Sequence, residues 1–314
     1  MRYGFGVDIG GTTVKIAWYE ESGKMLREWE IPTVRDNEGV QILPDVAASL
    51  NAFLEENGVD RQQVIGIGVG VPGPVNSRSV VNRCVNLGWG IVDIAKELTA
   101  LTGLPVKAGN DANVAALGEY WQGSGRDYES MVMATLGTGV GGGIVVDGHM
   151  LHGAHGCGGE IGHIVMNRDE TEVCGCGKRG CAEQYCSATG VARLARIRLA
   201  EDDAPSTLRQ LGKIEARNVF DAGKQGDAVA NEILERYYEY LGEFLAIICT
   251  TVDPEVIVLG GGVCKAGQVL LDGIRRYYVK YAFHATTGVQ FAIAQLGNSA
   301  GTCGAFKLAL DAFG

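Results

Sequence analysis

The chain has 314 residues and a formal net charge of −10 at pH 7, an acidic balance that argues against a protein that wraps nucleic acid or binds an anionic membrane surface. No apolar run approaches the length of a membrane span, and the N-terminus lacks the apolar core of a signal peptide. Glycine supplies 47 residues and 46% are hydrophobic, so we expect a globular, cytoplasmic enzyme of about two domains.

The N-terminal part alternates between strand and helix patterns. Period-two alternation on both sides of a Gly/Thr turn predicts two strands within residues 3–18, and helical spacing recurs further along. The later predicted strands are 25–31, 64–71 and 104–106. The predicted helices are 38–57, 91–102 and a segment that is capped by Asn110 and Asp111 and ends near Trp121.

The second part repeats this alternation. The predicted strands are 131–136, 144–146 and 255–259, and the predicted helices are 188–200, 227–251, 266–280 and 300–313. Residues 153–186 are rich in glycine and cysteine and are predicted to be irregular. Strands interleaved with helices indicate an α/β fold. We expect a smaller domain from residues 1–112 plus 299–314, and a larger one from 113–298.

A short pattern occurs twice. A Gly/Thr turn at 10–13 and another at 137–139 each lead into a strand, a tight turn and a Met-Leu pair, at 25–26 and 150–151. One interpretation is coincidence, because β-hairpins are common. The other is a duplicated domain, in which each copy offers one Gly/Thr turn to a shared cleft.

The glycine turns predict a nucleotide site. Residues 137–142 match the spacing GxGxxG, but a strand follows instead of the helix that a dinucleotide fingerprint requires, so we reject that interpretation. Backbone N–H groups in glycine turns and threonine hydroxyls can bind phosphate, and Gly260–Gly262 adds a third turn after a buried strand. The alternative is a set of ordinary hairpin turns.

Three charged side chains, Asp8, Lys15 and Asp111, have two interpretations each. Asp8 is either a magnesium ligand beside nucleotide phosphates or a capping residue whose carboxylate accepts the N–H groups of the turn that follows it. Lys15 either reaches a phosphate or is solvated. Asp111 either caps a helix or acts as the general base for a hydroxyl nucleophile, and both roles are compatible.

The cysteine-rich segment predicts a metal site. His163, Cys174, Cys176 and Cys181 are the soft ligands that tetrahedral zinc prefers, in a loop whose glycines let it wrap an ion. Glu160 and Glu183 flank the cluster and could accept hydrogen bonds from sugar hydroxyls. The residues that could replace one of the four ligands are His155, Cys157 and Cys186. The scattered cysteines Cys84, Cys157, Cys249, Cys264 and Cys303 are predicted to be buried.

Together these motifs resemble one family. The chain is similar to the ROK family (repressors, open reading frames and sugar kinases), and within it to the bacterial glucokinases. The resemblance spans essentially the whole chain in the family's order. The segments that carry it are 8–12 (DIGGT), 71–75 (VPGPV), 86–89 (NLGW), 110–113 (NDAN), 136–143 (LGTGVGGG), 159–163 (GEIGH) and 174–183 (CGCGKRGCAE).

The resemblance implies an actin/hexokinase-like (ribonuclease H-like), duplicated two-domain α/β fold with an interdomain cleft. It implies ATP-dependent phosphorylation of a hexose, glucose to glucose 6-phosphate above all, with Asp111 as the base and Mg²⁺ near Asp8. The implied sugar-binding residues are Gly73, Asn86, Asn110, Asp111, Glu160, His163 and Glu183. The implied nucleotide-binding residues are Asp8, Gly10, Gly11, Thr12, Thr13, Lys15, Thr138, Gly139, Gly261 and Gly262. The implied ligands of a structural Zn²⁺ are His163, Cys174, Cys176 and Cys181.

Other functions stay open at this point. The hexose could be N-acetylmannosamine, N-acetylglucosamine, fructose or allose. A sugar-sensing ROK regulator is a rival, but the few residues before Asp8 leave no room for a helix-turn-helix segment. An actin-like structural ATPase would not need the Glu/His/Cys loop. We expect no nucleic-acid or membrane partner, and a homodimer or homotetramer.

Overall fold

The structure is a computed structural model that describes residues 1–314. The chain forms two compact units. The first contains Met1–Tyr128, Gly143–Gly159 and Gln295–Gly314, and the second contains Glu129–Gly142 and Glu160–Ala294. No helix is both long enough and apolar enough to cross a membrane.

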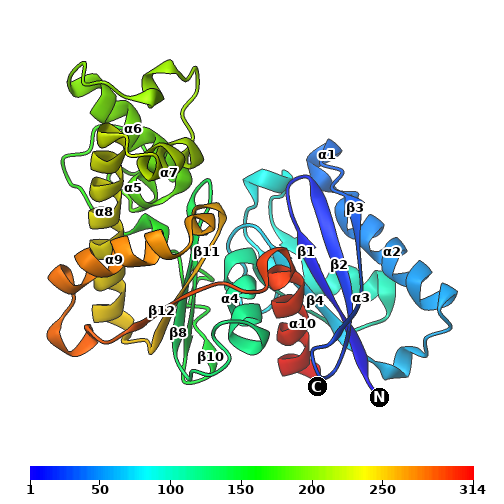
Figure 1. Cartoon of the computed structure of the whole chain (residues 1–314). Helices are drawn as coiled ribbons and strands as arrows, with labels where there is room; N and C mark the ends of the chain where they lie inside the picture. The colour runs from blue at the N-terminus through cyan, green and yellow to red at the C-terminus, as the bar shows by residue number, and fades with distance from the viewer. The chain divides into compact units, whose positions relative to one another are not determined.

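A five-stranded sheet forms the centre of the first unit, with the strand order β3-β2-β1-β4-β7 (Figure 1). Strand β1 pairs with β2 in antiparallel and with β4 in parallel orientation. The first three strands are therefore a meander, and the last two need helical crossovers. The bounds are β1 Tyr3–Ile9, β2 Thr13–Glu20, β3 Met25–Pro32, β4 Val64–Val71 and β7 Val106–Asn110.

Helices cover both faces of this sheet. On one face, buried residues of α2 such as Leu50 pack against Phe5 and Val7. On the other face, Phe306 of α10 packs against Tyr19 with ring centroids 5.2 Å apart. The helices are α1 Asp36–Gly39, α2 Ile42–Glu56, α3 Ile94–Thr102, α4 Asp111–Gln122 and α10 Ala300–Phe313, and a small ribbon pairs β5 Val80–Val81 with β6 Val92–Asp93.

Alternating glycines in β1 and β4 have a packing role. A Cβ added to Gly6 would lie 1.9 Å from the carbonyl oxygen of Thr302, and one added to Gly68 would lie 1.6 Å from that of Ala305. Only glycine therefore lets α10 lie this close to the sheet. A Cβ at Gly304 of α10 would meet the carbonyl oxygen of Val114 in α4 at 1.7 Å, so the same rule holds between these two helices.

A second five-stranded sheet has the order β10-β9-β8-β11-β12, which repeats the order of the first sheet. Again the first strand of a meander, here β8, pairs in parallel with the next strand, β11. The repetition confirms the predicted duplicated α/β fold. The bounds are β8 Met131–Leu136, β9 Val140–Val146, β10 His149–Met150, β11 Val256–Gly260 and β12 Gln290–Ile293.

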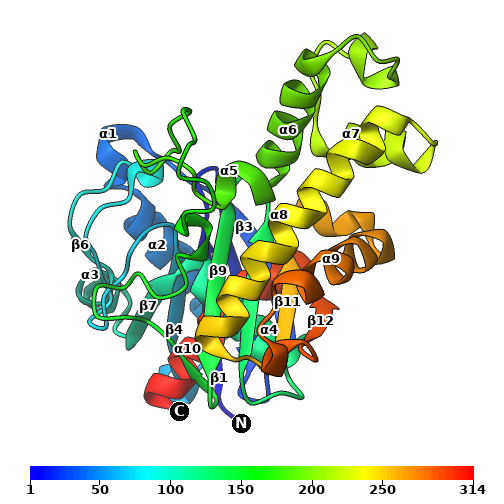
Figure 2. The ribbon, with the colours of Figure 1, turned by 90° about the vertical axis from the view of Figure 1, so that its left-hand side faces the viewer.

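The helices of the second unit pack around α8. This long helix contacts α6, α7 and α9 (Figure 2). Its Tyr237 and Phe244 side chains are completely buried. The bounds are α5 Glu183–Cys186, α6 Ala188–Glu201, α7 Ala216–Lys224, α8 Ala228–Val252 and α9 Gln268–Tyr281.

The domain borders predicted after residues 112 and 298 stay a prediction, and the compact units divide the chain elsewhere. Helix α4 belongs with the first unit because its backbone touches α10, as Gly304 shows. Residues 143–159 belong there too, since a Cβ at Gly143 would lie 2.3 Å from the Cβ of Ala116 in α4.

Candidate active site

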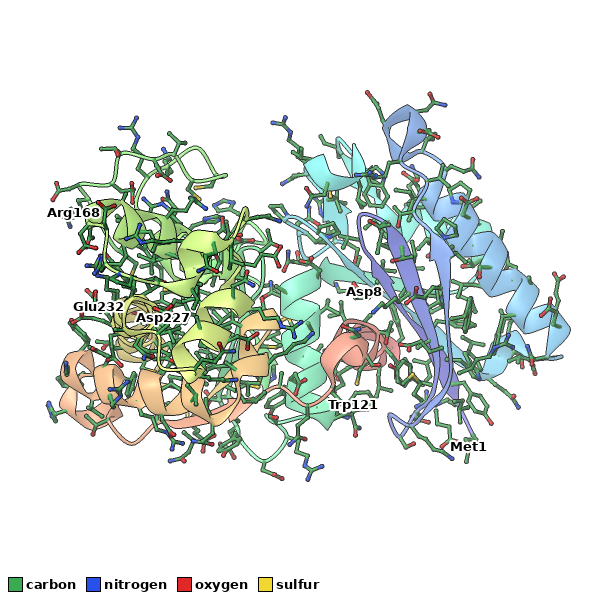
Figure 3. All side chains as sticks on the ribbon, turned by 45° about the horizontal axis from the view of Figure 1, so that its top comes forward. Met1, Asp8, Trp121, Arg168, Asp227 and Glu232 are labelled. Carbon is green, nitrogen blue, oxygen red and sulfur yellow. The ribbon has the colours of Figure 1, made fainter.

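Asp8 lies near the end of β1, opposite Lys15 in the pairing of β1 with β2 (Figure 3). A Cβ at Gly301 of α10 would lie 2.4 Å from its Oδ2, so the carboxylate rests against that helix. The following turn closes through Gly10 N–H donating to the Thr13 carbonyl over 3.0 Å. The two interpretations of Asp8, as a magnesium ligand and as a capping residue, stay predictions.

The surroundings of Asp8 disfavour its charged form. Burial, followed by the nearby Asp111 carboxylate, raises the pKa of Asp8 from 3.8 to about 6, although Lys15 acts in the opposite direction. The Lys15 Nζ donates to the carbonyl oxygen of Asn298 over 3.5 Å. A divalent cation would relieve the repulsion between two carboxylates, so this set of oxygen donors suits Mg²⁺.

The raised pKa of Asp8 predicts a stability that depends on pH. Because the folded protein holds this proton more tightly than the unfolded chain does, the contribution is favourable below pH 4 and is lost as pH rises through about 6. We expect Asp8→Asn to raise the free energy of unfolding at pH 7.5 by about 1–3 kcal/mol, with the gain vanishing near pH 4. Denaturant titrations at both pH values measure this.

The exposed Asp203 offers a matched control for that substitution. Asp203→Asn should change the free energy of unfolding by less than about 0.5 kcal/mol at either pH. A variant of Asp8 that is less stable than the parent at pH 7.5 would contradict the prediction.

Asn110 and Asp111 share the start of α4 but have different roles. Asn110 is the cap, since its Oδ1 accepts the N–H groups of Ala112 and Asn113 over 3.0 and 3.1 Å. Its Nδ2 donates to the Gly73 carbonyl over 3.2 Å. Asp111 is the first helical residue, and its Oδ1 accepts the Ala112 N–H over 2.8 Å. The prediction that Asp111 caps this helix is therefore wrong, because Asn110 holds that position.

Asn86 lies beside the first glycine turn. It sits in the short 3-10 segment Val85–Leu87, where its side chain is exposed, and a Cβ at Gly11 would lie 4.0 Å from its carbonyl oxygen. Thr12 and Thr13 are exposed in the same turn. The first unit thus brings predicted sugar-binding and nucleotide-binding residues together, whereas their binding roles stay predictions.

In the second unit, the turn between β8 and β9 is fixed to the start of α6. The Gly137 N–H donates to the Gly139 carbonyl over 3.0 Å, and the Gly137 carbonyl accepts the Ala188 N–H over 2.8 Å. Thr189 Oγ1 donates to the Thr138 carbonyl over 2.8 Å. Because strand β9 follows directly, the rejection of a dinucleotide fingerprint is confirmed.

A cavity of about 930 Å³ opens beside this turn, within the range typical of sites for small molecules. The predicted residues Thr138 and Gly262 line it, and a Cβ at Gly261 would lie 2.5 Å from the Leu136 carbonyl, which explains that glycine. The sequence analysis missed most of the lining, whose charged members are Arg196, Lys213, Glu215, Arg217, Asp221, Lys224 and Lys265.

Glu183 connects this turn to residues 174–181, which carry three of the predicted metal ligands and are called the cysteine loop below. Its Oε2 accepts the Val140 N–H over 3.1 Å and would lie 2.1 Å from a Cβ added to Gly139. Its Oε1 is 3.6 Å from the sulfur of Cys174. The sequence predicted a sugar-binding role for Glu183 but not this link, which depends on contacts between distant segments.

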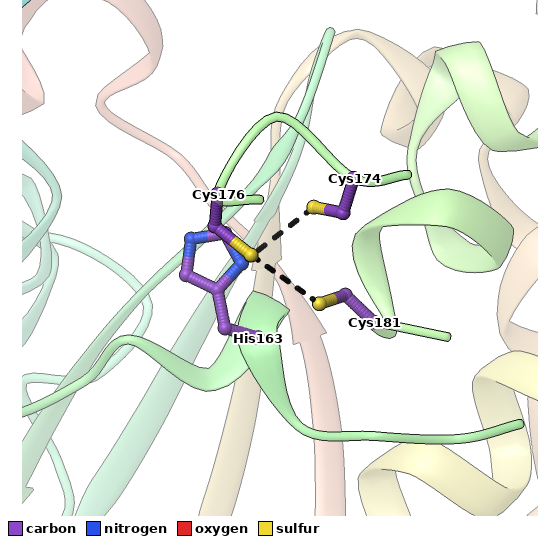
Figure 4. Close-up of side chains that lie close together, drawn as sticks. All are labelled: His163, Cys174, Cys176 and Cys181. Carbon is purple, nitrogen blue, oxygen red and sulfur yellow. Dashed lines mark hydrogen bonds between the residues drawn. The ribbon is translucent and has the colours of Figure 1, made fainter. Parts of the chain in front are cut away.

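The predicted metal ligands converge in the second unit (Figure 4). The ligand atoms of His163, Cys174, Cys176 and Cys181 lie within 4.8 Å of one another. The sulfurs of Cys176 and Cys181 are 3.6 Å apart, close to the roughly 3.8 Å that zinc–sulfur bonds of about 2.3 Å give in a tetrahedral site. Three soft sulfurs and one imidazole therefore fit zinc.

His163 presents its two ring nitrogens to different neighbours. Nδ1 is 4.0 Å from the sulfur of Cys174, whereas Nε2 is 3.8 Å from Oε2 of Glu160. One nitrogen thus faces the cysteines while the other faces a carboxylate that could share a ligand with it. This geometry agrees with the predicted double role of His163 toward metal and sugar.

The remaining cysteines lie outside this cluster. Cys186, the last residue of α5, is completely buried. Cys84, Cys249, Cys264 and Cys303 are buried as predicted. Cys157 is exposed, so the prediction of burial is wrong there. It lies between Gly156 and Gly158 in a loop, and its sulfur is 3.7 Å from the carbonyl oxygen of His155.

The chain is similar to known proteins over nearly its whole length. A family model described as "ROK family" matches residues 4–312. The chain is 41% identical to a glucokinase of Halalkalibacterium halodurans (96% of this chain, 93% of that protein) and 33% identical to one of Thermotoga maritima (98% of each). A crystal structure of a ROK family glucokinase from Streptomyces griseus, in complex with glucose and AMPPNP, matches with a TM-score of 0.75 and 34% identity, covering 98% of this chain and 99% of that one.

Proposed function

The chain belongs to the ROK family, and we infer that it is an ATP-dependent sugar kinase that phosphorylates glucose. The observation that carries this inference is the 41% identity to a glucokinase over 96% of the chain. The geometry agrees with it, because each unit presents a glycine turn beside polar groups suited to a phosphorylated ligand and a sugar. The product of the reaction would be glucose 6-phosphate.

The cavity in the second unit is the proposed site for the nucleotide. Its volume of about 930 Å³ suits a nucleoside triphosphate, and its cationic side chains outnumber the acidic ones. Support comes from the Streptomyces griseus glucokinase, which binds AMPPNP, an analogue of ATP. We assign Thr138, Gly139, Gly261 and Gly262 to this site. Within the first unit, we propose nucleotide-binding roles for Asp8, Lys15 and residues 10–13.

Phosphoryl transfer depends mainly on positioning and on stabilising charge. In our proposal, Asp111, the first residue of α4, accepts the proton of the attacking sugar hydroxyl. Asn86, Asn110, Glu160, His163 and Glu183 orient the sugar, together with the Gly73 backbone. Asp8 would hold Mg²⁺, which supplies positive charge beside the phosphates.

We also propose that the cysteine loop holds one structural zinc ion. Purified protein should contain about one zinc per chain by elemental analysis, because three sulfurs and one imidazole close a four-ligand site. Cys181→Ser should lower both the zinc content and the affinity for sugar, since metal binding folds the loop. Cys157→Ser, at an exposed cysteine, is the control and should keep the zinc. Active protein that was never exposed to a chelator and contains no zinc would refute the proposal.

A panel of hexoses with ATP and Mg²⁺ in a coupled assay tests the substrate. We expect the highest kcat/KM with glucose, compared with N-acetylmannosamine, N-acetylglucosamine, fructose and allose. A different preferred hexose would change the substrate but keep the reaction class. Sugar binding without any phosphorylation would instead favour a regulator. A cytoplasmic location and a homodimer or homotetramer stay predictions.

A further inference from the structure

A buried arginine on α6 joins the segment that precedes the cysteine loop. Arg193 is only 8% exposed, and its Nε donates to Oε2 of Glu172 over 2.8 Å. Its Nη2 donates to Oε2 of Glu170 over 2.6 Å. One guanidinium group therefore holds two carboxylates that lie two and four residues before Cys174.

The segment that follows the loop is bound to the same group. Tyr185, two residues after Glu183, donates its hydroxyl to Oε2 of Glu170. The guanidinium of Arg193 lies over the Tyr185 ring, with its Cζ 5.2 Å from the ring centroid. Asn167 Nδ2 donates to the Tyr185 hydroxyl over 3.1 Å. Both ends of the loop thus meet at Arg193.

Gln184 adds a second tie between the two ends. Its Nε2 donates to the Glu172 carbonyl over 3.1 Å, and its Oε1 accepts the Cys181 N–H over 3.2 Å. The network therefore continues into the backbone of a predicted metal ligand. Its members lie on either side of the residues that would bind metal and sugar.

Stability alone does not account for Arg193. Nη1 is buried without an acceptor among the protein atoms, and a buried unsatisfied donor costs about 1–3 kcal/mol. Buried ion pairs are often no more stabilising than apolar side chains of similar volume. The benefit of the arginine is better explained by its geometry, because a planar guanidinium can fix two carboxylates in one orientation.

We propose that Arg193 is a positioning residue that sets both ends of the cysteine loop, and through them Glu183 and the metal ligands. The proposal rests on the sugar kinase function given above. It places Arg193 outside the reacting groups, so its loss should weaken sugar binding and metal retention more than it slows the chemical step.

The same helix contains a matched control. Arg198 is 6% exposed and pairs with Glu232 over 2.6 Å and with Asp202 over 3.0 Å, on segments that do not lead to the loop. Arg193→Met and Arg198→Met therefore remove the same charge from guanidinium groups of similar exposure, each of which pairs with two acidic side chains. Only the first change disconnects the cysteine loop.

The experiment compares these two variants and Arg193→Lys with the parent, as purified. The measurements are the rate of zinc release to a chromogenic chelator, KM and kcat for glucose, and Tm. We expect Arg193→Met to increase the rate of zinc release and the KM for glucose, each by about 10–100-fold. The change in kcat should be far smaller. Arg198→Met should lower Tm but keep parental zinc release and KM. Arg193→Lys, which keeps the charge but not the planar fork, should be intermediate.

Equal zinc release and equal KM in the two methionine variants would overturn the proposal. If Arg193→Met does not fold, Arg193→Lys carries the test, and parental values there would also overturn it. A parent that does not phosphorylate glucose would refute the proposed function, while zinc release would still decide the role of Arg193. If the parent contains no zinc, the KM values for glucose of the two methionine variants decide the role of Arg193.

Discussion

Asp111→Asn is expected to lower kcat by at least about 10²-fold, with little change in Tm. A general base contributes typically about 10²–10⁴-fold, and an amide cannot take the proton. The fold should tolerate the change, because Asn110 and not Asp111 caps α4, and an amide oxygen can still accept the Ala112 N–H. Sugar affinity should largely survive. The measurements are kcat, KM for glucose and Tm.

Asp93→Asn is the matched control for this prediction. Asp93 caps α3 by accepting the Lys96 N–H over 3.0 Å, so the substitution changes a carboxylate at a helix start in the same unit. Asn caps about as well as Asp, and both kcat and Tm should stay near the parental values. A near-normal kcat for Asp111→Asn would remove Asp111 as the base and direct the search to Glu160 or Glu183.

The sequence predicted the regular elements well where a strong period or a glycine pattern was present. Strands 64–71 and 131–136 and helix 300–313 have the predicted bounds. The alternating glycines of β4 were visible in the sequence, but their reason was not. It became clear only from α10, which lies more than 200 positions later in the chain and whose Ala305 carbonyl would contact a Cβ at Gly68.

Helix α7 and strand β12 are among the elements that were missed because their local signals are weak. Helix α7 has nine residues, of which only Val219, Phe220 and Ala222 are buried. Three buried positions are too few to show a clear helical period. Strand β12 has four residues at the edge of its sheet, too few for a recognisable alternation. The strand predicted at 144–146 begins earlier than expected, since β9 begins at Val140 and continues through glycines 141–143. Glycine there permits close packing within a strand.

The site was predicted where residue types reveal their chemistry, and missed where only packing creates it. Three cysteines within eight positions indicate a metal site without any structure. The cavity lined by Arg196, Lys213 and Lys265 has no such signal, because residues from four separate segments form it. The sequence predicted a cap at Asn110 and Asp111 together, because two adjacent cap-forming residues fit the same pattern. Only backbone geometry shows that Asn110 is the cap.

Gly139→Ala should impair the site while leaving the fold intact. The added Cβ would lie 2.1 Å from Oε2 of Glu183, so the carboxylate must move away from the Val140 N–H that it accepts at 3.1 Å. The end of a flexible side chain moves at a low energetic cost, and Tm should therefore change little. Moving Glu183 also disturbs its approach to Cys174, because its other oxygen is 3.6 Å from that sulfur.

Misplacement of a site residue by about 1 Å can cost about 10²-fold in rate, so we expect kcat/KM to fall by about 10–100-fold for both glucose and ATP. Gly137→Ala is the matched control, since it lies in the same turn and an added Cβ meets nothing within 4 Å. Its kcat/KM values should remain close to those of the parent. Glu183 contacts both the backbone after the proposed nucleotide-binding turn and the sulfur of Cys174. A loss confined to ATP would therefore contradict the link between the two proposed sites. Equal kcat/KM values in the two alanine variants would show that Glu183 need not hold this position.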